Sequence, residues 1–269
     1  MKHIPNILTL GNLFFGCVAI TLILSTEPHL ITTDGGSSYY PIMGSSQLVW
    51  GSICIFIAAF FDVLDGMMAR VLNAFSPLGK DLDSLADMVS FGVAPAMILY
   101  KMLWMAEMAV PNAMDGMSWL VYLAFLLPCF GALRLARFNQ EHVGPATWFS
   151  GMPIPAAGII VALLPLIIFY QNNGLMPNVS AAVANFIQNK WIIIGFTLLL
   201  SILMVSRTPF LKWKSPKPGL TGWWAHLAIV IVGILGYLLI GFSGLLIAFV
   251  VYIIVSKMYQ YPAPSKTSV

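Results

Sequence analysis

The sequence has little charge. Only 9% of its 269 residues are Asp, Glu, Lys or Arg, whereas 59% are hydrophobic. A soluble domain of this length carries far more charge, so the composition argues against a water-soluble protein. The net charge of +3 is also too small to suggest a nucleic-acid partner, and we expect none. The composition therefore predicts a polytopic membrane protein.

Cysteine is scarce as well. The three cysteines, Cys17, Cys54 and Cys129, lie singly in apolar segments, without the spacing of a disulfide framework or a zinc site. We interpret them as small buried residues.

The apolar residues fall into eight segments, each long enough to form a helix across or close to a bilayer. We predict an all-α, polytopic transmembrane bundle of about eight spans. The last two segments are separated only by Gly-Phe-Ser-Gly and form a tight hairpin or, alternatively, one re-entrant unit. The segments lie at about 5–25, 47–72, 82–105, 117–138, 152–170, 190–206, 222–240 and 243–259.

Lysine and arginine indicate the orientation of these spans. With a cytoplasmic N-terminus, 11 of the 13 basic residues fall on the cytoplasmic side, and only Lys101 and Lys190 fall on the other. Cytoplasmic loops carry such an excess of positive charge. We expect an integral protein of the cell inner or plasma membrane with 62–87 facing the cytoplasm.

Five of the ten acidic residues lie in 62–87, between two strongly apolar segments. Asp62 and Asp65 are three residues apart, and Asp83 and Asp87 are four apart, so each pair shares one helix face. Asp81 lies off the second face and is left out of the site. Acidic residues beside a bilayer are costly, and their presence there indicates function.

Four converging carboxylates need cations to offset their repulsion. Their hard oxygen ligands favour magnesium or manganese, and no paired His or Cys stands nearby to favour zinc. Gly66 and Gly79 allow a ligand to approach the backbone, and Arg70 suits a phosphate or a carboxylate. These are the elements of metal-assisted phosphoryl transfer. The alternative is a structural helix pair whose buried acids are neutralised by Arg70 and Lys80.

The whole pattern resembles the signature of the CDP-alcohol phosphotransferases, with all eight fixed positions filled at the family's spacing. The pattern is Asp62-x2-Asp65-Gly66-x2-Ala69-Arg70-x8-Gly79-x3-Asp83-x3-Asp87.

The resemblance implies two divalent cations, magnesium or manganese, bound by Asp62, Asp65, Asp83 and Asp87, with Asp87 also the general base. It further implies a six-helix core, which we place at 1–212, followed by a two-helix extension at 213–269. Family members often begin with a similar Pro-Asn-x-Leu-Thr near the nucleotide; capping of the first helix is the alternative explanation for its polar residues. The implied nucleotide-binding residues are Asn6, Thr9, Asp62, Gly66, Ala69, Arg70, Gly79 and Lys80.

Three further stretches resemble the bacterial and archaeal phosphatidylserine synthases of this family: SLADMVSFGVAPA from Ser84, RLARFN from Arg134, and GMPIPAA from Gly151. The implied reaction transfers a phosphatidyl group from CDP-diacylglycerol to L-serine. We expect membrane lipids as further partners, and a homodimer. The alternatives are the same chemistry with another alcohol, such as glycerol 3-phosphate or an inositol derivative, and, outside enzymes, a cation carrier or channel.

Arginine is the best single partner for the carboxylate of an acceptor such as serine. Arg134, Arg137 and Arg207 lie at the ends of apolar segments on the predicted cytoplasmic side and are the candidates for contact with the acceptor or the lipid phosphate. The alternative is that they only anchor helix ends at the interface.

Overall fold

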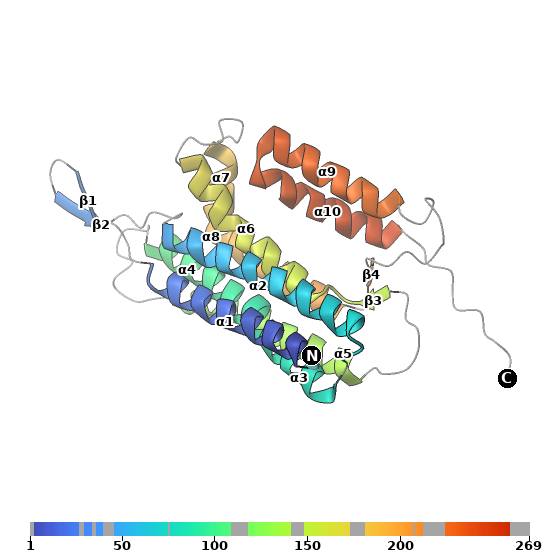
Figure 1. The fold of residues 1–269 in the computed structure, drawn as a ribbon. Coiled ribbons are helices and arrows are strands. Elements are labelled where there is room, and N and C mark those ends of the chain that lie inside the picture. The colour runs from blue at the N-terminus through green and yellow to red at the C-terminus, as the bar shows by residue number, and fades with distance from the viewer. Residues whose placement is uncertain are drawn as a thin grey trace.

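The computed structural model describes residues 3–26, 30–33, 36–39, 46–74, 76–108, 118–140, 148–172, 181–206, 208–211 and 224–258. These residues form a bundle of helices with two small strand pairs at its edges (Figure 1). The helices are α1 (Ile4–Leu24), α2 (Ser46–Val71), α3 (Pro77–Asp87), a π-helical turn (Met88–Val93), α4 (Ala94–Met108), a 3-10 segment (Trp119–Phe125), α5 (Leu126–Gln140), α6 (Ile154–Asn172), α7 (Ala181–Gln188), α8 (Lys190–Val205), α9 (Trp224–Ile240) and α10 (Phe242–Met258).

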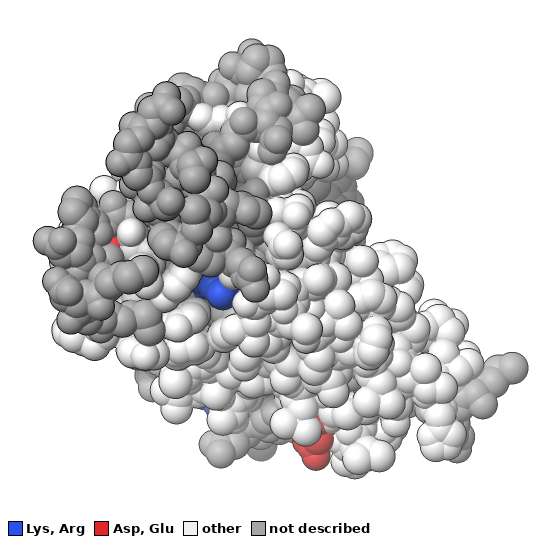
Figure 2. Space-filling view, turned by 90° about the vertical axis from the view of Figure 1, so that its left-hand side faces the viewer, with Lys and Arg blue, Asp and Glu red and all other residues white. Residues whose placement is uncertain are grey.

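Five helical segments are long and apolar enough to cross a membrane, and three shorter apolar helices follow them. This confirms the polytopic all-α bundle. The face shown in Figure 2 is almost uncharged over the described residues, as a surface facing lipid requires. The five long segments are Ile4–Leu24, Ser46–Val71, Pro77–Met108, Trp119–Phe138 and Ile154–Gln171.

The strands are short and antiparallel. In the first pair, β1 (Leu30–Thr33) lies beside β2 (Gly36–Tyr39) in the connection between α1 and α2. In the second pair, β3 (Trp148–Ser150) lies beside β4 (Pro209–Leu211), so the segment before α6 meets the segment after α8. Neither pair has a clear signal in the sequence, and α7 was not predicted either.

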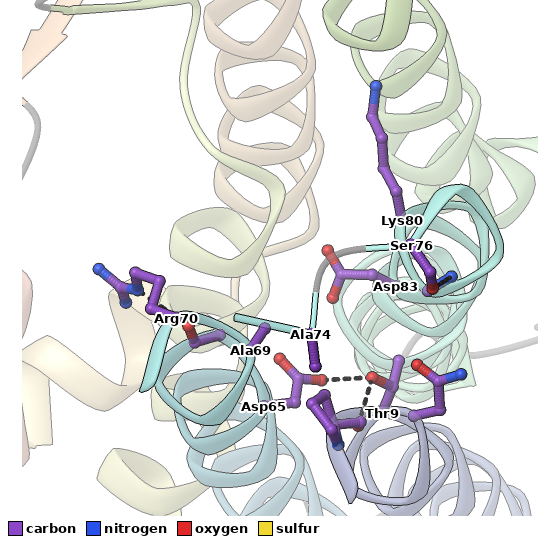
Figure 3. A pocket seen from close by; sticks show the side chains of 12 residues that line it. Thr9, Asp65, Ala69, Arg70, Ala74, Ser76, Lys80 and Asp83 are labelled. Atoms are coloured by element: carbon purple, nitrogen blue, oxygen red, sulfur yellow. Dashed lines mark hydrogen bonds between the residues drawn. The ribbon is translucent and has the colours of Figure 1, made fainter. Parts of the chain in front are cut away.

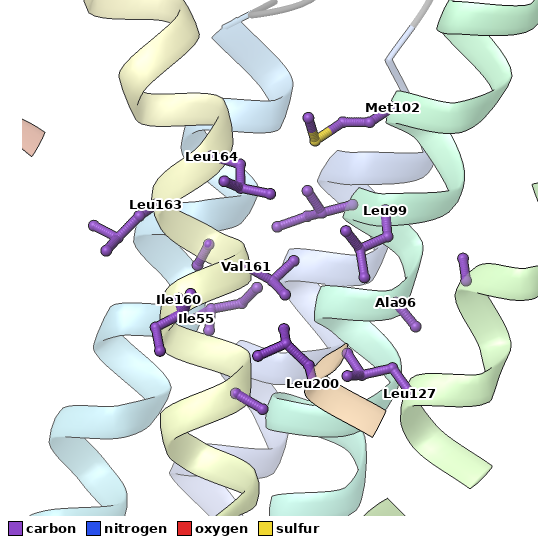
Figure 4. Packing of buried hydrophobic residues seen from close by; sticks show 14 of the residues in the cluster. Ile55, Ala96, Leu99, Met102, Leu127, Ile160, Val161, Leu163, Leu164 and Leu200 are labelled. Carbon is purple, nitrogen blue, oxygen red and sulfur yellow. The ribbon is translucent and has the colours of Figure 1, made fainter. Parts of the chain in front are cut away.

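The core lies between α2, α4, α5, α6 and α8 (Figure 4). Ile55, Leu99, Leu127, Val161 and Leu200, one from each of these helices, are fully buried there. These five side chains are branched and apolar, and their close contact indicates that the centre of the bundle is held by packing.

The corner between α2 and α3 is built from local backbone signals. Asn73 takes a left-handed conformation (φ 47°) that ends α2, and the Ala74 N–H bonds back to the Ala69 carbonyl at 3.0 Å. Ser76 then caps α3 by accepting from the Gly79 N–H at 3.0 Å, and Pro77 occupies the first turn. The prediction that this helix begins at 82 was wrong, because Ser76 and Pro77 start it at 77.

A wide π-helical turn follows Asp87 directly. The Ala94 N–H bonds to the Val89 carbonyl, five residues back, and Pro95, which has no N–H to donate, lies just beyond. A proline within a helix commonly kinks it at that position. The structure places the irregularity before Pro95, in the π turn, where one extra residue is accommodated and backbone hydrogen bonds span five residues.

The aspartates and the residues Lys101 and Lys190 lie at opposite ends of the bundle. At one end, Lys101 donates to the Thr26 carbonyl at 2.9 Å, and Lys190 pairs with Glu107 at 3.1 Å. Thr26 follows the C-terminal end of α1, whereas the aspartates contact its N-terminal half. The two basic residues assigned to the opposite side by sequence therefore lie at the end of the bundle away from the aspartates.

The C-terminal helices form the predicted hairpin. Gly241 takes a positive φ of 62° at the turn, and α10 packs on the core through a Tyr170–Phe242 ring contact at 5.1 Å. The two helices approach closely at Gly236 and Gly244, where a Cβ on Gly244 would overlap the Gly236 backbone.

This close approach yields a prediction. Gly244→Leu should force the helices apart and cost roughly 1–3 kcal/mol through overpacking. Limited proteolysis in detergent should then release the C-terminal helices faster than in the parent. Gly233→Ala is the matched control, because its Cβ would meet Ala248 at an ordinary 3.6 Å. Equal proteolysis rates for Gly244→Leu and the parent would contradict the packing.

Candidate functional site

Two helices bring the four aspartates together. Asp62 and Asp65 come from α2, and Asp83 and Asp87 from α3. Carboxylate oxygens of Asp62, Asp83 and Asp87 all lie within 4.8 Å of one another. The predicted convergence is therefore present, with three of the four side chains in one cluster.

Asp65 is held separately by α1. Its Oδ2 lies 2.7 Å from the Thr9 hydroxyl, which is also 3.0 Å from the Pro5 carbonyl (Figure 3). The hydroxyl has one proton, and the shorter, charge-assisted bond to the carboxylate is the stronger of the two. Thr9 thus fixes Asp65 and does not cap α1, whose N-cap residue is His3. One turn further along α1, the Asn12 Nδ2 donates to Asp87 Oδ1 at a longer 3.4 Å.

The cluster of Asp62, Asp83 and Asp87 carries a strong electrostatic cost. Two unit charges about 5 Å apart repel by roughly 3 kcal/mol at the effective dielectric of a partly buried site. Asp87 is only 9% exposed and Asp62 and Asp83 are half-buried, so water relieves this repulsion poorly. A divalent cation would relieve it, and an all-oxygen donor set suits magnesium or manganese. The three aspartates fit such an ion by charge, spacing and chemistry.

A pocket of about 490 Å³ opens beside the aspartates. Figure 3 shows Asp65 and Asp83 on facing helices, with Thr9 completing the wall from α1. Seven of the eight predicted nucleotide-binding residues line it, and Asp62 does not. The lining residues are Pro5, Asn6, Thr9, Asp65, Gly66, Ala69, Arg70, Ala74, Ser76, Gly79, Lys80 and Asp83.

The two glycines of the pattern act differently. A Cβ on Gly66 would meet only the Arg70 side chain, at 3.9 Å, so glycine keeps this part of the pocket open. A Cβ on Gly79 would come within 3.0 Å of both Asn6 Oδ1 and Ser76 Oγ. Gly79 therefore lets the first turn of α3 pack closely against the start of α1.

Basic side chains flank the pocket. The Arg70 Nε donates to the Gly66 carbonyl at 2.8 Å, and its guanidinium points away from Asp65 (Figure 3). Lys80 extends from α3 on the other side of the pocket. Among the described residues Arg70 forms no ion pair with an aspartate, so the alternative of a purely structural helix pair lacks one of its two cations.

The two described arginines among the three acceptor candidates have different surroundings. Arg134 is only 7% exposed, lies over the Phe138 ring at 5.4 Å and is within electrostatic reach of Asp87 and Tyr252. Arg137 Nη1 donates to the Val205 carbonyl at 3.0 Å, at the C-terminal end of α8. Arg207 lies outside the described residues. The structure thus brings Arg134 toward the aspartates and gives Arg137 a bond between helices.

Some residues of this region were not assigned to the site from the sequence. Pro5, Ala74 and Ser76 line the pocket, and Asn12 bonds to Asp87. The Ser-Pro start of α3 could have identified Ser76. The spacing of Asn6, Thr9 and Asn12 could have placed Asn12 on the same side of α1.

The model of the family described as CDP-alcohol phosphatidyltransferase matches residues 2–203. The matched region includes every aspartate of the site and all residues that line the pocket.

Individual relatives are named for related activities. A CDP-diacylglycerol–serine O-phosphatidyltransferase of Bacillus subtilis is 32% identical over 215 residues, covering 80% of this chain and 93% of the relative. One of the same name from Helicobacter pylori is 30% identical over 218 residues, covering 79% and 73%. An archaetidylserine synthase of Methanothermobacter thermautotrophicus is 33% identical over 156 residues, covering 58% and 62%.

The aspartate cluster predicts metal binding that can be measured without substrate. The purified chain should bind Mn²⁺, detected by electron paramagnetic resonance, and Asp83→Asn should weaken binding at least about tenfold through the loss of a charged ligand. Asp81→Asn is the matched control on the same helix, because Asp81 is exposed and outside the cluster. Equal affinity in both variants would contradict a metal site here.

Proposed function

Because the chain belongs to the CDP-alcohol phosphatidyltransferase family, we propose that it transfers the phosphatidyl group of CDP-diacylglycerol to the hydroxyl of L-serine. The products are phosphatidylserine and CMP. One observation carries the proposal: the aspartates of the family pattern gather beside a pocket at one end of a membrane bundle. The serine specificity draws on the names of the relatives in bacteria.

Two divalent cations, magnesium or manganese, are part of this proposal. Asp62, Asp83 and Asp87 would hold them from the cluster, and Asp65, fixed by Thr9, would complete the set. When bound, the cations neutralise the pyrophosphate charge and polarise the phosphorus that is attacked.

The chain's own residues supply binding and proton transfer. The serine hydroxyl oxygen forms a new bond to the phosphorus that carries diacylglycerol. The bond from that phosphorus to the bridging oxygen breaks, and the oxygen leaves with CMP. Asp87 takes the hydroxyl proton, because it is the most buried member of the cluster and a carboxylate beside cations remains ionised.

The pocket is the proposed nucleotide site. Asn6 and Thr9 from α1, Gly66, Ala69 and Arg70 from α2, and Gly79 and Lys80 from α3 line it, while Asp62 would contribute through the cluster beside it. Arg70 and Lys80 place positive charge on either side of a pyrophosphate, and Gly66 gives it room to approach the backbone.

The substrates fit a site at the membrane surface on the cytoplasmic side. The lipid tails of CDP-diacylglycerol would remain in the bilayer, while its nucleotide enters the pocket at the end of the bundle. The orientation rests on the distribution of lysine and arginine, and Lys101 and Lys190 lie at the far end as that orientation requires. A homodimer, a 1–212 core and a 213–269 extension remain part of the proposal.

The acceptor alcohol is tested directly. The purified protein is given CDP-diacylglycerol and Mn²⁺ with L-serine, glycerol 3-phosphate or inositol separately, and CMP release is measured. We expect rapid release with serine alone, abolished by excess chelator and restored by Mg²⁺ or Mn²⁺. Release with glycerol 3-phosphate or inositol but not serine would overturn the acceptor, and full turnover in chelator would overturn the role of the metals.

Arg134 is the proposed contact for the serine carboxylate. Arg134→Lys keeps the charge but loses the bidentate fork, so the KM for serine should rise about tenfold while the KM for CDP-diacylglycerol changes little. Arg137→Lys is the comparison, because Arg137 bonds to a helix end instead. An unchanged KM for serine in Arg134→Lys would contradict the contact.

A further inference from the structure

Asn12 is a fully buried polar residue next to the proposed base. It lies on α1, one turn after Thr9, and none of its surface is exposed. Its Nδ2 donates to Asp87 Oδ1 at 3.4 Å. That separation is long, as hydrogen bonds of catalytic groups often are before substrate binds. Burying an amide costs free energy unless the amide is hydrogen-bonded, and the contact with Asp87 offsets part of that cost.

The backbone of Asn12 is fixed as well. Its carbonyl accepts from the Ser90 hydroxyl at 2.9 Å. Ser90 belongs to the π turn that begins directly after Asp87, and it sits against Gly16 on the next turn of α1, where any Cβ would overlap it. The backbone of Asn12 is therefore fixed by the same helical segment that carries Asp87.

The neutrality of the amide is important. A lysine or arginine at this position would form an ion pair with Asp87 and make the carboxylate a weaker proton acceptor. An amide N–H orients the same oxygen and leaves the carboxylate's charge in place. The Asn12 Oδ1 has no hydrogen-bond partner within the described residues, although it is buried. An acceptor atom left open at such depth is consistent with a donor group that arrives with a ligand.

We propose that Asn12 is a positioning residue for Asp87, holding one carboxylate oxygen so that the other takes the proton of the acceptor alcohol. This inference rests on the proposed function. It goes beyond the family pattern, which begins at Asp62, and makes α1 part of the proton-transfer machinery.

The test compares steady-state kinetics with metal binding. Asn12→Leu removes the amide at similar volume, and the loss of a hydrogen bond to a charged group should lower kcat about 10- to 100-fold. The KM values for serine and CDP-diacylglycerol, and the affinity for Mn²⁺ measured without substrate, should stay within about threefold of the parent. A residue that only packs would not separate kcat from these three quantities.

A control and a second variant make the test decisive. Ser52→Ala removes a different fully buried polar group, a hydroxyl on α2 next to Gly51, which packs on Ile23 near the C-terminal end of α1. It should leave kcat unchanged. Asn12→Ser keeps a polar group but is too short to reach Asp87, so it should lose kcat as Asn12→Leu does. The Asn12→Ser variant tests the positioning role if Asn12→Leu fails to fold.

Two results would overturn the inference. A kcat within about threefold of the parent in a folded Asn12 variant would show that Asp87 needs no help from α1. A loss of kcat matched by an equal loss of Mn²⁺ affinity would show that Asn12 supports metal binding instead. Failure of the proposed function is recognised separately, because the parent itself would then release no CMP with serine.

Discussion

The repulsion among Asp62, Asp83 and Asp87 is the constraint on which the rest of the site depends. Three carboxylates within 4.8 Å of one another, in a chain with 9% charged residues, are unfavourable until cations bind. The packed core therefore stabilises the helices that carry a locally unfavourable cluster. Binding of the proposed cations would stabilise the corner of α2 and α3, because it would remove a repulsion that the fold otherwise retains.

The first helix organises this cluster from one side. Asn6, Thr9 and Asn12 recur at three-residue intervals and so share a face of α1. Asn6 lies against Gly79, Thr9 donates to Asp65, and Asn12 donates to Asp87. One helix thus contacts both helices that carry the aspartates. The capping interpretation of these residues does not hold for the structure, since each one contacts the site and none caps the helix.

Much of this was accessible from the sequence because spacing and composition are local properties. The apolar segments predicted the helical bundle, and the intervals between the aspartates predicted that each pair lies on one helix face. Contacts between distant segments were not accessible. Nothing near Arg134 or Arg137 indicates that one lies within reach of Asp87 while the other bonds to Val205, and nothing near Ser90 indicates a bond to Asn12. The start of α3 at Pro77 was missed although Ser76 and Pro77 carry a recognisable start signal.

The C-terminal hairpin shows how an element outside the family match is tied to the site. It follows the matched residues 2–203, yet the ring of Tyr252 in α10 contacts the ring of Phe210 in β4 at 5.8 Å in a tilted arrangement, and β4 pairs with β3 just before α6. Gly151 (φ 81°) continues that link, because its N–H bonds to the Thr208 carbonyl and any Cβ there would overlap the Met204 carbonyl. The hairpin therefore braces the strand pair that joins α6 to the end of α8, where Arg137 also bonds. Through this brace, residues far beyond the aspartates help to fix the region around Arg134.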